Sequence, residues 1–204
     1  GGCMNFNAVI LAGGKSSRMG RDKAWLEIGG QTLLARQISL VRTFGAAEVF
    51  ISGRADADYS AFGCRVLPDH FQNAGPLAGI EIALHVTTAP LLLVLAVDMP
   101  EMNLNFLQRL RAACGENCGA VPQRGGRIEP LAAFYPKAAW DLATAMLRGE
   151  RAGAETSAPG PTDFAKKCVK GKLAGLVETT AVEARCFINL NSPEDLRPQR
   201  NSVL

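Results

Sequence analysis

The segment that most constrains the fold is an unbroken apolar run at positions 89–97, APLLLVLAV, which is followed directly by Asp98. A central parallel strand has both faces covered by helices, so it reads as a continuous apolar run rather than as an alternating one. The run is also much too short to span a bilayer as a helix. We therefore predict a buried central strand of a parallel sheet, with Asp98 at its carboxyl end.

Segments typical of strands and of helices alternate along the rest of the chain. Helical stripes occur in QTLLARQISLVRTF, GPLAGIEIALHV, NLNFLQRLRAAC and KAAWDLATAML, and strand-like runs in NAVILA, AEVFIS, CRVLP, GAVPQ and PLAAFY. Gly45 stands where the first helix would end, and Asn103 where the third would begin. This alternation predicts an α/β fold, a Rossmann-like three-layer α/β/α sandwich with a mostly parallel central sheet.

The length of 204 residues fits one domain. We predict that this domain covers residues 4–197, that residues 1–3 are an expression remnant or a disordered start, and that residues 198–204 are a frayed tail. The Gly-, Ala- and Pro-rich stretch 149–161 predicts an exposed loop. The segment that begins CFINLN predicts a short strand, followed by a helix that starts at Ser192.

Charge and cysteine content exclude several classes of function. The net charge of +3 is too small to indicate a nucleic-acid-binding protein. The six cysteines form no C-x-x-C pair and the chain has two histidines, so the spacing typical of a zinc site is missing. The first residues do not have the pattern of a secretory signal. We expect reduced thiols in a cytoplasmic protein, with no nucleic-acid or membrane partner.

The first predicted strand leads into a glycine-rich basic loop, AVILAGGKSSRMGRDK at positions 8–23. In a Walker A loop the first glycine would fall on Val9, and the dinucleotide fingerprint would need a glycine at Lys15, so neither motif is present. Gly13 and Gly14 nevertheless allow the backbone to approach a ligand closely.

The charges of this loop favour a polyphosphate ligand. Arg18 can bind a phosphate with two parallel hydrogen bonds, and Lys15 and Lys23 can act as point charges. Ser16 and Ser17 add hydroxyl donors. The alternative interpretation is a glycine-rich turn with a solvated basic surface.

The position of Asp98 at the end of a buried strand is compatible with two roles. The carboxylate could cap the following turn, or it could bind Mg²⁺ together with substrate phosphates, since Mg²⁺ prefers oxygen ligands. In a doubly wound sheet, ligands bind beyond the carboxyl ends of the strands. The basic loop and Asp98 are therefore predicted to meet at one edge of the sheet.

A third element follows the third predicted strand, PDHFQNAGPLAGI. Asp69 comes directly after the strand, and Gly75 and Gly79 leave space for a flat group such as a base to lie against the backbone. Pro76 is also common at the first position of a helix, so an ordinary helix start is the alternative.

Taken together, these segments resemble the molybdenum cofactor guanylyltransferase family, within the nucleotidyltransferase superfamily. The resemblance rests on LAGGKSSRMGRDK, GPLAGI, VDMP, EPLAAFYP and FINLNSPED, which occur in the family's order between Leu11 and Asp195. It implies that Lys23, Asp98 and Arg18 carry the catalysis, with Asp98 also binding Mg²⁺, and that Asn189 and Asn191 lie on the pterin side. The nucleotide-binding residues that it implies are Leu11, Ala12, Gly13, Gly14, Lys23, Asp69, Gly75, Pro76, Leu77, Gly79 and Asp98.

The resemblance implies transfer of GMP from GTP to the terminal phosphate of molybdopterin, with release of pyrophosphate. A CTP-dependent cytidylyltransferase and a non-catalytic module that binds or delivers the molybdenum cofactor remain as alternatives. The GG pair at Gly13 and Gly14 favours guanine over cytosine. We expect GTP and molybdopterin as substrates, contacts with cofactor-biosynthesis proteins or molybdoenzymes, and a monomer or weak oligomer.

Overall fold

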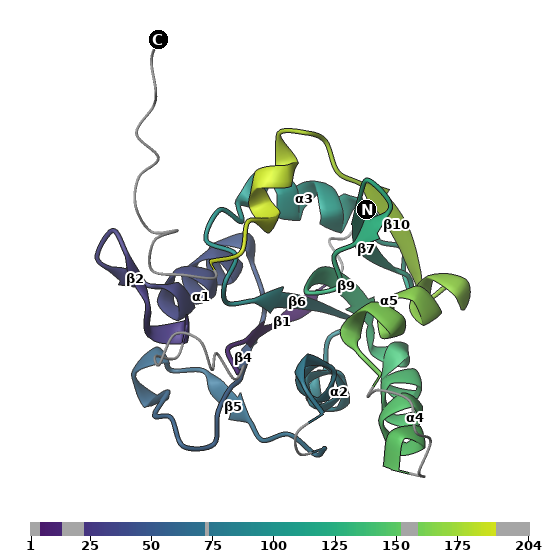
Figure 1. Ribbon diagram of the computed structural model, residues 1–204, viewed down its shortest axis with the longest axis horizontal. Helices are drawn as coiled ribbons and strands as arrows, with labels where there is room; N and C mark the ends of the chain where they lie inside the picture. The colour runs from purple at the N-terminus through teal and green to yellow at the C-terminus, as the bar shows by residue number, and fades with distance from the viewer. Residues whose placement is uncertain (1–4, 14–22, 72–73, 152–158, 191–204) are drawn as a thin grey trace.

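A computed structural model describes residues 5–13, 23–71, 74–151 and 159–190. These residues form a sheet of eight strands between two groups of helices, in the order β10-β7-β9-β6-β1-β4-β5, with β8 paired to β7 (Figure 1). The strands of this sheet are β1 (Phe6–Leu11), β4 (Val49–Ser52), β5 (Arg65–Leu67), β6 (Leu91–Ala96), β7 (Gly119–Arg124), β8 (Arg127–Ile128), β9 (Ala132–Pro136) and β10 (Ala174–Glu178). A separate hairpin consists of β2 (Glu27–Ile28) and β3 (Gln31–Thr32).

The sheet is mostly parallel, which confirms the predicted fold class. Strands β6, β1, β4 and β5 run parallel to one another, and β7 runs parallel to β10. Strand β9 is antiparallel to both of its neighbours, β6 and β7. The apolar run therefore has one parallel and one antiparallel neighbour, a distinction that hydrophobicity alone does not encode.

Helices cover both faces of the sheet, as the apolar run predicts. On β6, Leu91, Leu93 and Leu95 face one helical layer, whereas Leu92 and Val94 face the other, and all five are fully buried. Successive side chains of a strand point to opposite faces, so a strand covered on both sides must be apolar throughout. The first layer contains α1 (Leu33–Phe44) and α3 (Leu104–Ala112), and the second contains α2 (Pro76–Val86), α4 (Trp140–Arg151) and α5 (Pro161–Lys170).

The predicted helix boundaries at Gly45 and Asn103 are confirmed. Gly45 caps α1 with φ 98°, a left-handed conformation that glycine adopts without steric cost. The side chain of Asn103 accepts a hydrogen bond of 3.1 Å from the backbone N–H of Phe106 and so caps the start of α3.

One sequence prediction in the C-terminal half is wrong, and another is wrong at its boundaries. The expected loop 149–161 is partly helical, because α4 continues to Arg151 and α5 begins at Pro161. The expected strand at CFINLN is instead the end of a 3-10 helix, η4 (Glu183–Phe187), followed by an extended Ile188. The predicted helix start at Ser192 lies outside the described residues. Within the described ranges, every helix is too short or too polar to cross a membrane.

Candidate active site

The carboxyl ends of four parallel strands form the edge that carries the predicted site. Strands β6, β1, β4 and β5 are consecutive parallel neighbours in the sheet, so their carboxyl ends lie at one edge. Ser52 ends β4 there, and Asp98, Ala12 and Asp69 follow the ends of the other three strands. Backbone hydrogen bonds fix the start of the basic loop there, since the N–H groups of Ala12 and Gly13 both donate to the Ser52 carbonyl, over 2.8 and 3.1 Å. Such an edge is where open α/β sheets bind their ligands.

The structure brings Lys23 and Asp98 together. Lys23 Nζ lies 2.9 Å from Asp98 Oδ2, and the two side chains are 22% and 20% exposed. Lys23 opens a short 3-10 helix, η1 (Lys23–Trp25), and its carbonyl accepts a hydrogen bond from the Leu26 N–H. The predicted meeting of the basic loop with Asp98 is therefore confirmed at Lys23. The ion pair presents a cation for a phosphate and a carboxylate for a metal ion within one small, partly exposed space.

Three successive backbone carbonyls hold the turn that carries Asp98. The Asp98 carbonyl accepts from the N–H of Leu190 over 3.1 Å. Gln37 Nε2 donates to the Met99 carbonyl over 2.6 Å, and Arg36 Nε donates to the Pro100 carbonyl over 2.9 Å. Helix α1 and the segment after η4 thus fix the position of the acid from two sides.

Gln37 is a buried polar residue beside the Asp98 turn that sequence reasoning missed. Its side chain is 1% exposed, and its Oε1 is buried with no hydrogen-bond partner among the described residues. Such an unsatisfied acceptor costs folding free energy and calls for an explanation. The available clue is that Gln37 lies within the apolar stripe of α1 formed by Leu34, Ile38 and Val41, where a polar residue is out of place.

Replacing Gln37 separates its positioning role from a structural one. In Gln37→Met the Met99 carbonyl keeps its bond from the Met102 N–H, so no new unsatisfied group is created and an existing one is removed. We expect the free energy of unfolding to stay level or rise by about 1 kcal/mol. We expect kcat to fall about 10- to 100-fold, because a small displacement of Asp98 disturbs the geometry of the reaction.

The matched control for Gln37→Met is Thr87→Val at the opposite edge of the sheet. This variant removes the acceptor of Asn7 Nδ2, 3.0 Å away in a buried pair, and should cost about 1–3 kcal/mol of stability with kcat unchanged. Denaturant unfolding and steady-state kinetics on both variants give the comparison. A Gln37→Met variant that loses stability and keeps its kcat would show that Gln37 serves the fold alone.

Asp69 lies beside a buried acidic residue, Glu81. Burial raises the pKa of Asp69, the hydrogen bond from Ser52 opposes that rise, and the negative charge of Glu81 adds to it. The Glu81 carboxylate is 1% exposed and accepts from Trp140 Nε1 at 2.7 Å and Thr144 Oγ1 at 2.9 Å. His70, which directly follows Asp69, contacts Glu81 Oε2 through Nδ1 at 3.1 Å. These contacts tie the loop that carries Asp69 to α2 and α4.

The glycines of GPLAG have different surroundings. Gly75 is exposed and has φ 67°, a left-handed conformation, directly before the exposed Pro76 that opens α2. Gly79 is buried, and a Cβ at this position would lie 2.3 Å from Ser52 Oγ. Its small size therefore lets α2 pack against the sheet. Leu77 is fully buried in the same layer, and contact of these residues with a nucleotide stays a prediction.

Several predicted site residues cannot be placed. Gly14, Arg18 and Asn191 lie outside the described residues, as do Lys15, Ser16 and Ser17 of the same loop. Asn189 is exposed and directly precedes Leu190, whose N–H donates to the Asp98 carbonyl. The segment that the resemblance assigns to the pterin side therefore passes next to Asp98.

The Lys23–Asp98 ion pair offers a single carboxylate to a metal ion. Among the described residues, no group of three or more His, Cys, Asp or Glu side chains is arranged to hold a metal ion. Mg²⁺ is usually bound through one or two carboxylates, with waters and substrate phosphates completing its shell. The single partly exposed carboxylate of Asp98 fits an ion that arrives with a nucleotide, and it does not fit a dedicated protein cage.

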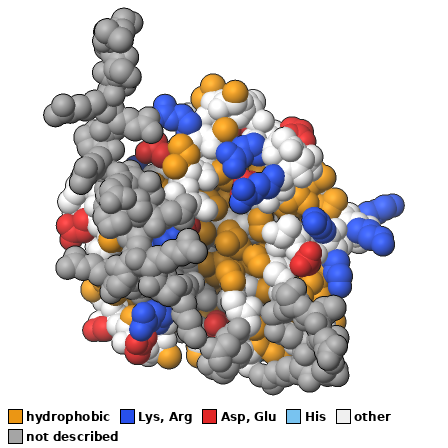
Figure 2. Space-filling view, viewed as in Figure 1, with side chains coloured by type: hydrophobic (Ala, Val, Ile, Leu, Met, Phe, Trp, Pro, Cys, Tyr) orange, Lys and Arg blue, Asp and Glu red, His pale blue; other side chains and the backbone are white. Residues whose placement is uncertain are grey.

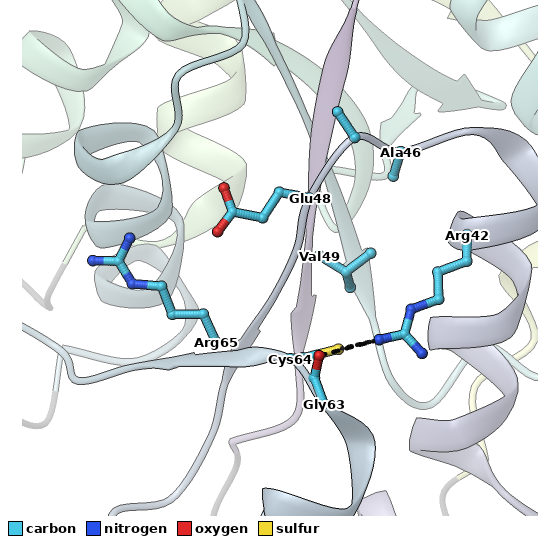
Figure 3. Close-up of a pocket in the computed structure, with 8 residues that line it drawn as sticks. Arg42, Ala46, Glu48, Val49, Gly63, Cys64 and Arg65 are labelled. Carbon is cyan, nitrogen blue, oxygen red and sulfur yellow. Dashed lines mark hydrogen bonds between the residues drawn. The ribbon is translucent and has the colours of Figure 1, made fainter.

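A cleft of about 270 Å³ lies at the opposite, amino-terminal edge of the sheet, next to the starts of β4 and β5 (Figure 3). Arg42 reaches across it, and its Nη2 donates to the Phe62 carbonyl over 3.0 Å and to Cys64 Sγ over 3.3 Å. These contacts clamp the turn before β5. The cleft contains none of the predicted site residues, so it is separate from the candidate active site.

The described cysteines are free thiols. Burial raises the pKa of Cys168 to about 12 and that of Cys114 to about 11. Both thiols are therefore protonated at neutral pH and are poor nucleophiles.

A parallel α/β edge at which Lys23 meets Asp98 is the arrangement that we expect of a nucleotidyltransferase. The family assignment follows from sequence comparison: the profile of the MobA-like NTP transferase domain family matches residues 8–158, and the chain belongs to this family. The predicted resemblance and the predicted enzyme class are thus both confirmed.

Individual relatives agree with the assignment. The chain is 39% identical to a probable molybdenum cofactor guanylyltransferase of Opitutus terrae, covering 94% of this chain and 93% of the relative. It is 37% identical to the molybdenum cofactor guanylyltransferase of Rhizobium meliloti, covering 93% and 88%. Its fold is similar to molybdopterin-guanine dinucleotide biosynthesis protein A of Archaeoglobus fulgidus, with a TM-score of 0.70 at 20% identity over 93% and 94% of the two chains.

Proposed function

We propose that the chain transfers GMP from GTP to the terminal phosphate of molybdopterin, releasing pyrophosphate and forming molybdopterin guanine dinucleotide. The observation that carries this proposal is the 2.9 Å approach of Lys23 Nζ to Asp98 Oδ2 at the carboxyl edge of the sheet. The names of the curated relatives at 37–39% identity support the choice of substrates.

The proposed reaction exchanges one phosphoanhydride bond for another. An oxygen of the molybdopterin phosphate forms a bond to the α-phosphorus of GTP. The bond between that phosphorus and the oxygen that bridges it to the β-phosphorus breaks. Pyrophosphate then leaves with the electron pair of the broken bond. The attacking phosphate is already ionised, so no general base is required. Catalysis of this kind depends on positioning and on the stabilisation of negative charge.

Lys23, Arg18 and Asp98 divide this work in the proposal. Lys23 binds the triphosphate and offsets the repulsion between two anionic substrates. Arg18, which belongs to the same loop, binds a phosphate oxygen. Asp98 holds Mg²⁺, which when bound would neutralise phosphate charge. The Lys23–Asp98 ion pair then keeps the two groups poised before the substrates bind.

Two other functions have partial support. A CTP-dependent cytidylyltransferase would use the same charges, whereas the Gly13–Gly14 pair and the names of the curated relatives favour guanine. A non-catalytic module that only binds the cofactor would not need a metal-binding acid in contact with a phosphate-binding lysine.

Pyrophosphate release distinguishes these functions. The protein is incubated with molybdopterin, Mg²⁺ and each of the four NTPs in turn. We expect release with GTP at least about 10-fold faster than with CTP, a factor that corresponds to about 1.4 kcal/mol of discrimination. Preference for CTP would assign the chain to cytidylyl transfer. Tight pterin binding without release from any NTP would favour the binding module.

A further inference from the structure

Strand β6 divides the active-site edge into two halves. Strands β1, β4 and β5 lie on one side of it and carry the predicted nucleotide-binding residues, whereas β9, β7 and β10 lie on the other. In an in-line phosphoryl displacement, the attacking and leaving oxygens lie on opposite sides of the phosphorus. If the triphosphate extends over β1, the acceptor phosphate approaches Asp98 from the side of β9 and β7.

A hairpin projects from the edge on that second side. Strand β7 runs in the same direction as β6, because each of them is antiparallel to β9. The carboxyl end of β7, the turn at Gly125 and Gly126, and β8 therefore lie at the Asp98 edge. Both turn glycines have positive φ, 54° and 81°, which allows this tight reversal.

Glu129, just after this hairpin, donates its N–H to the Pro122 carbonyl over 2.9 Å and lies at the end of the β6–β9 ladder that Asp98 follows. Leu95 pairs with Ala132, and the Ala96 N–H donates to the Leu131 carbonyl over 2.8 Å beyond that pair. Asp98 lies three residues after Leu95, and Glu129 lies three residues before Ala132. Both acidic residues therefore lie just beyond the same end of the β6–β9 ladder.

Two guanidinium groups converge on Glu129. Arg124 Nη2 lies 3.3 Å and Arg127 Nε 3.7 Å from Glu129 Oε1, and the Glu129 side chain is 9% exposed. The side chains of Arg124 and Arg127 are 39% and 73% exposed. One buried carboxylate therefore orients two accessible cations, which leaves one positive charge in excess. Each guanidinium has five N–H donors, so donors remain for an anion.

Other contacts fix the base of the hairpin. The N–H of Thr179 donates to the Gln123 carbonyl over 2.9 Å, and Gln123 Nε2 donates to Glu178 Oε1 over 2.8 Å. Lysine and arginine side chains, with acidic side chains among them, are seen over the half of the view where β7, β10 and α5 lie in Figure 1 (Figure 2).

We propose that Arg124 and Arg127 form the subsite for the phosphate monoester of the acceptor, with Glu129 orienting both guanidinium groups. The ligand class is an organic phosphate monoester, which a guanidinium fork binds through two parallel hydrogen bonds. This inference rests on the proposed function, because it assigns the second substrate of the same reaction. It adds two cations to a pterin side that the sequence assigned only to Asn189 and Asn191.

The test compares Arg124→Gln and Arg127→Gln with Lys166→Gln, which removes an exposed cation from α5. We expect each arginine variant to raise the KM for molybdopterin about 10-fold, the effect of losing one charge-assisted contact, while the KM for GTP changes less than about two-fold. Arg127→Lys should recover part of the loss, because it keeps the charge but not the fork. Lys166→Gln should leave both KM values unchanged.

The comparison of these variants still tests the acceptor subsite if GTP proves not to be the substrate. Should the protein prefer CTP, the same KM comparison is made with CTP. Should it transfer nothing, direct binding of molybdopterin to the wild-type protein and to the variants replaces the kinetics. An unchanged acceptor KM or affinity in both arginine variants would overturn the subsite, and so would an equal loss of affinity for GTP and acceptor.

Discussion

Asp98→Asn is expected to lower kcat about 1000-fold at saturating GTP and Mg²⁺ and to leave the stability of the protein nearly unchanged. Asparagine keeps the size of the side chain but removes the charge that would hold the metal ion, whose stabilisation of phosphate charge is worth several kcal/mol. The ion pair to Lys23 is partly exposed, at 22% and 20%, so its loss should cost no more than about 1 kcal/mol. Steady-state kinetics and thermal unfolding measure the two effects separately.

The control for Asp98→Asn is Glu183→Gln, which breaks a different partly exposed ion pair, with Arg109 40% and Glu183 17% exposed. Glu183 Oε1 lies 2.6 Å from Arg109 Nε. We expect a comparable small effect on stability, with kcat within about two-fold of wild type. If the kcat of Asp98→Asn is also within about two-fold of the wild-type value, Asp98 has no part in the mechanism.

Lys23→Met is expected to lower kcat/KM for GTP about 1000-fold, through both a higher KM and a lower kcat. Methionine keeps much of the aliphatic length of lysine but removes the charge that binds the triphosphate in the ground state and in the transition state. Loss of one preorganised electrostatic contact at a reacting phosphate typically costs 10²- to 10³-fold in kcat. Direct titration with a non-hydrolysable GTP analogue separates the binding component from kcat.

The double variant shows whether Lys23 and Asp98 work as one unit. Residues that act together in catalysis have strongly non-additive effects, so Lys23→Met/Asp98→Asn should be little slower than the worse single variant. Single-variant effects on kcat that multiply fully in the double variant would show instead that the two residues act independently.

Much of the site could be predicted because its residues follow strand ends. The apolar run before Asp98 and the glycine-rich loop after Leu11 each mark a strand that stops at the ligand-binding edge. Parallel neighbours then bring these ends together regardless of sequence distance. The Lys23–Asp98 contact joins residues 75 positions apart for this reason.

Other features depend on information that local patterns do not contain. The direction of β9 is set by its connections, so its antiparallel pairing with β6 is invisible in its apolar sequence. Helix α5 is short, and its buried residues Phe164, Ala165 and Cys168 are interspersed with lysines that suggest a solvated surface. The contact of Gln37 with the Met99 carbonyl is tertiary, and only a polar residue on an apolar stripe hints at it.

The strand expected at CFINLN failed for a related reason. A short apolar run favours a strand, yet this segment lies across the strand ends, where the Leu190 N–H bonds to the Asp98 carbonyl. The chain there crosses the edge of the sheet and has no neighbouring strand with which to form a ladder. Its apolar residues Cys186, Phe187 and Leu190 are buried against the layer of α1 and α3 instead.

The most direct test of the account is a crystal structure of the protein with Mn²⁺, in place of Mg²⁺, and a non-hydrolysable GTP analogue. We predict an anomalous peak at coordination distance from an Asp98 carboxylate oxygen and from a phosphate oxygen of the same nucleotide, with Lys23 Nζ within hydrogen-bonding distance of the triphosphate. A nucleotide bound elsewhere, or bound here with its metal ion away from Asp98 and its phosphates out of reach of Lys23, would contradict the proposed active site.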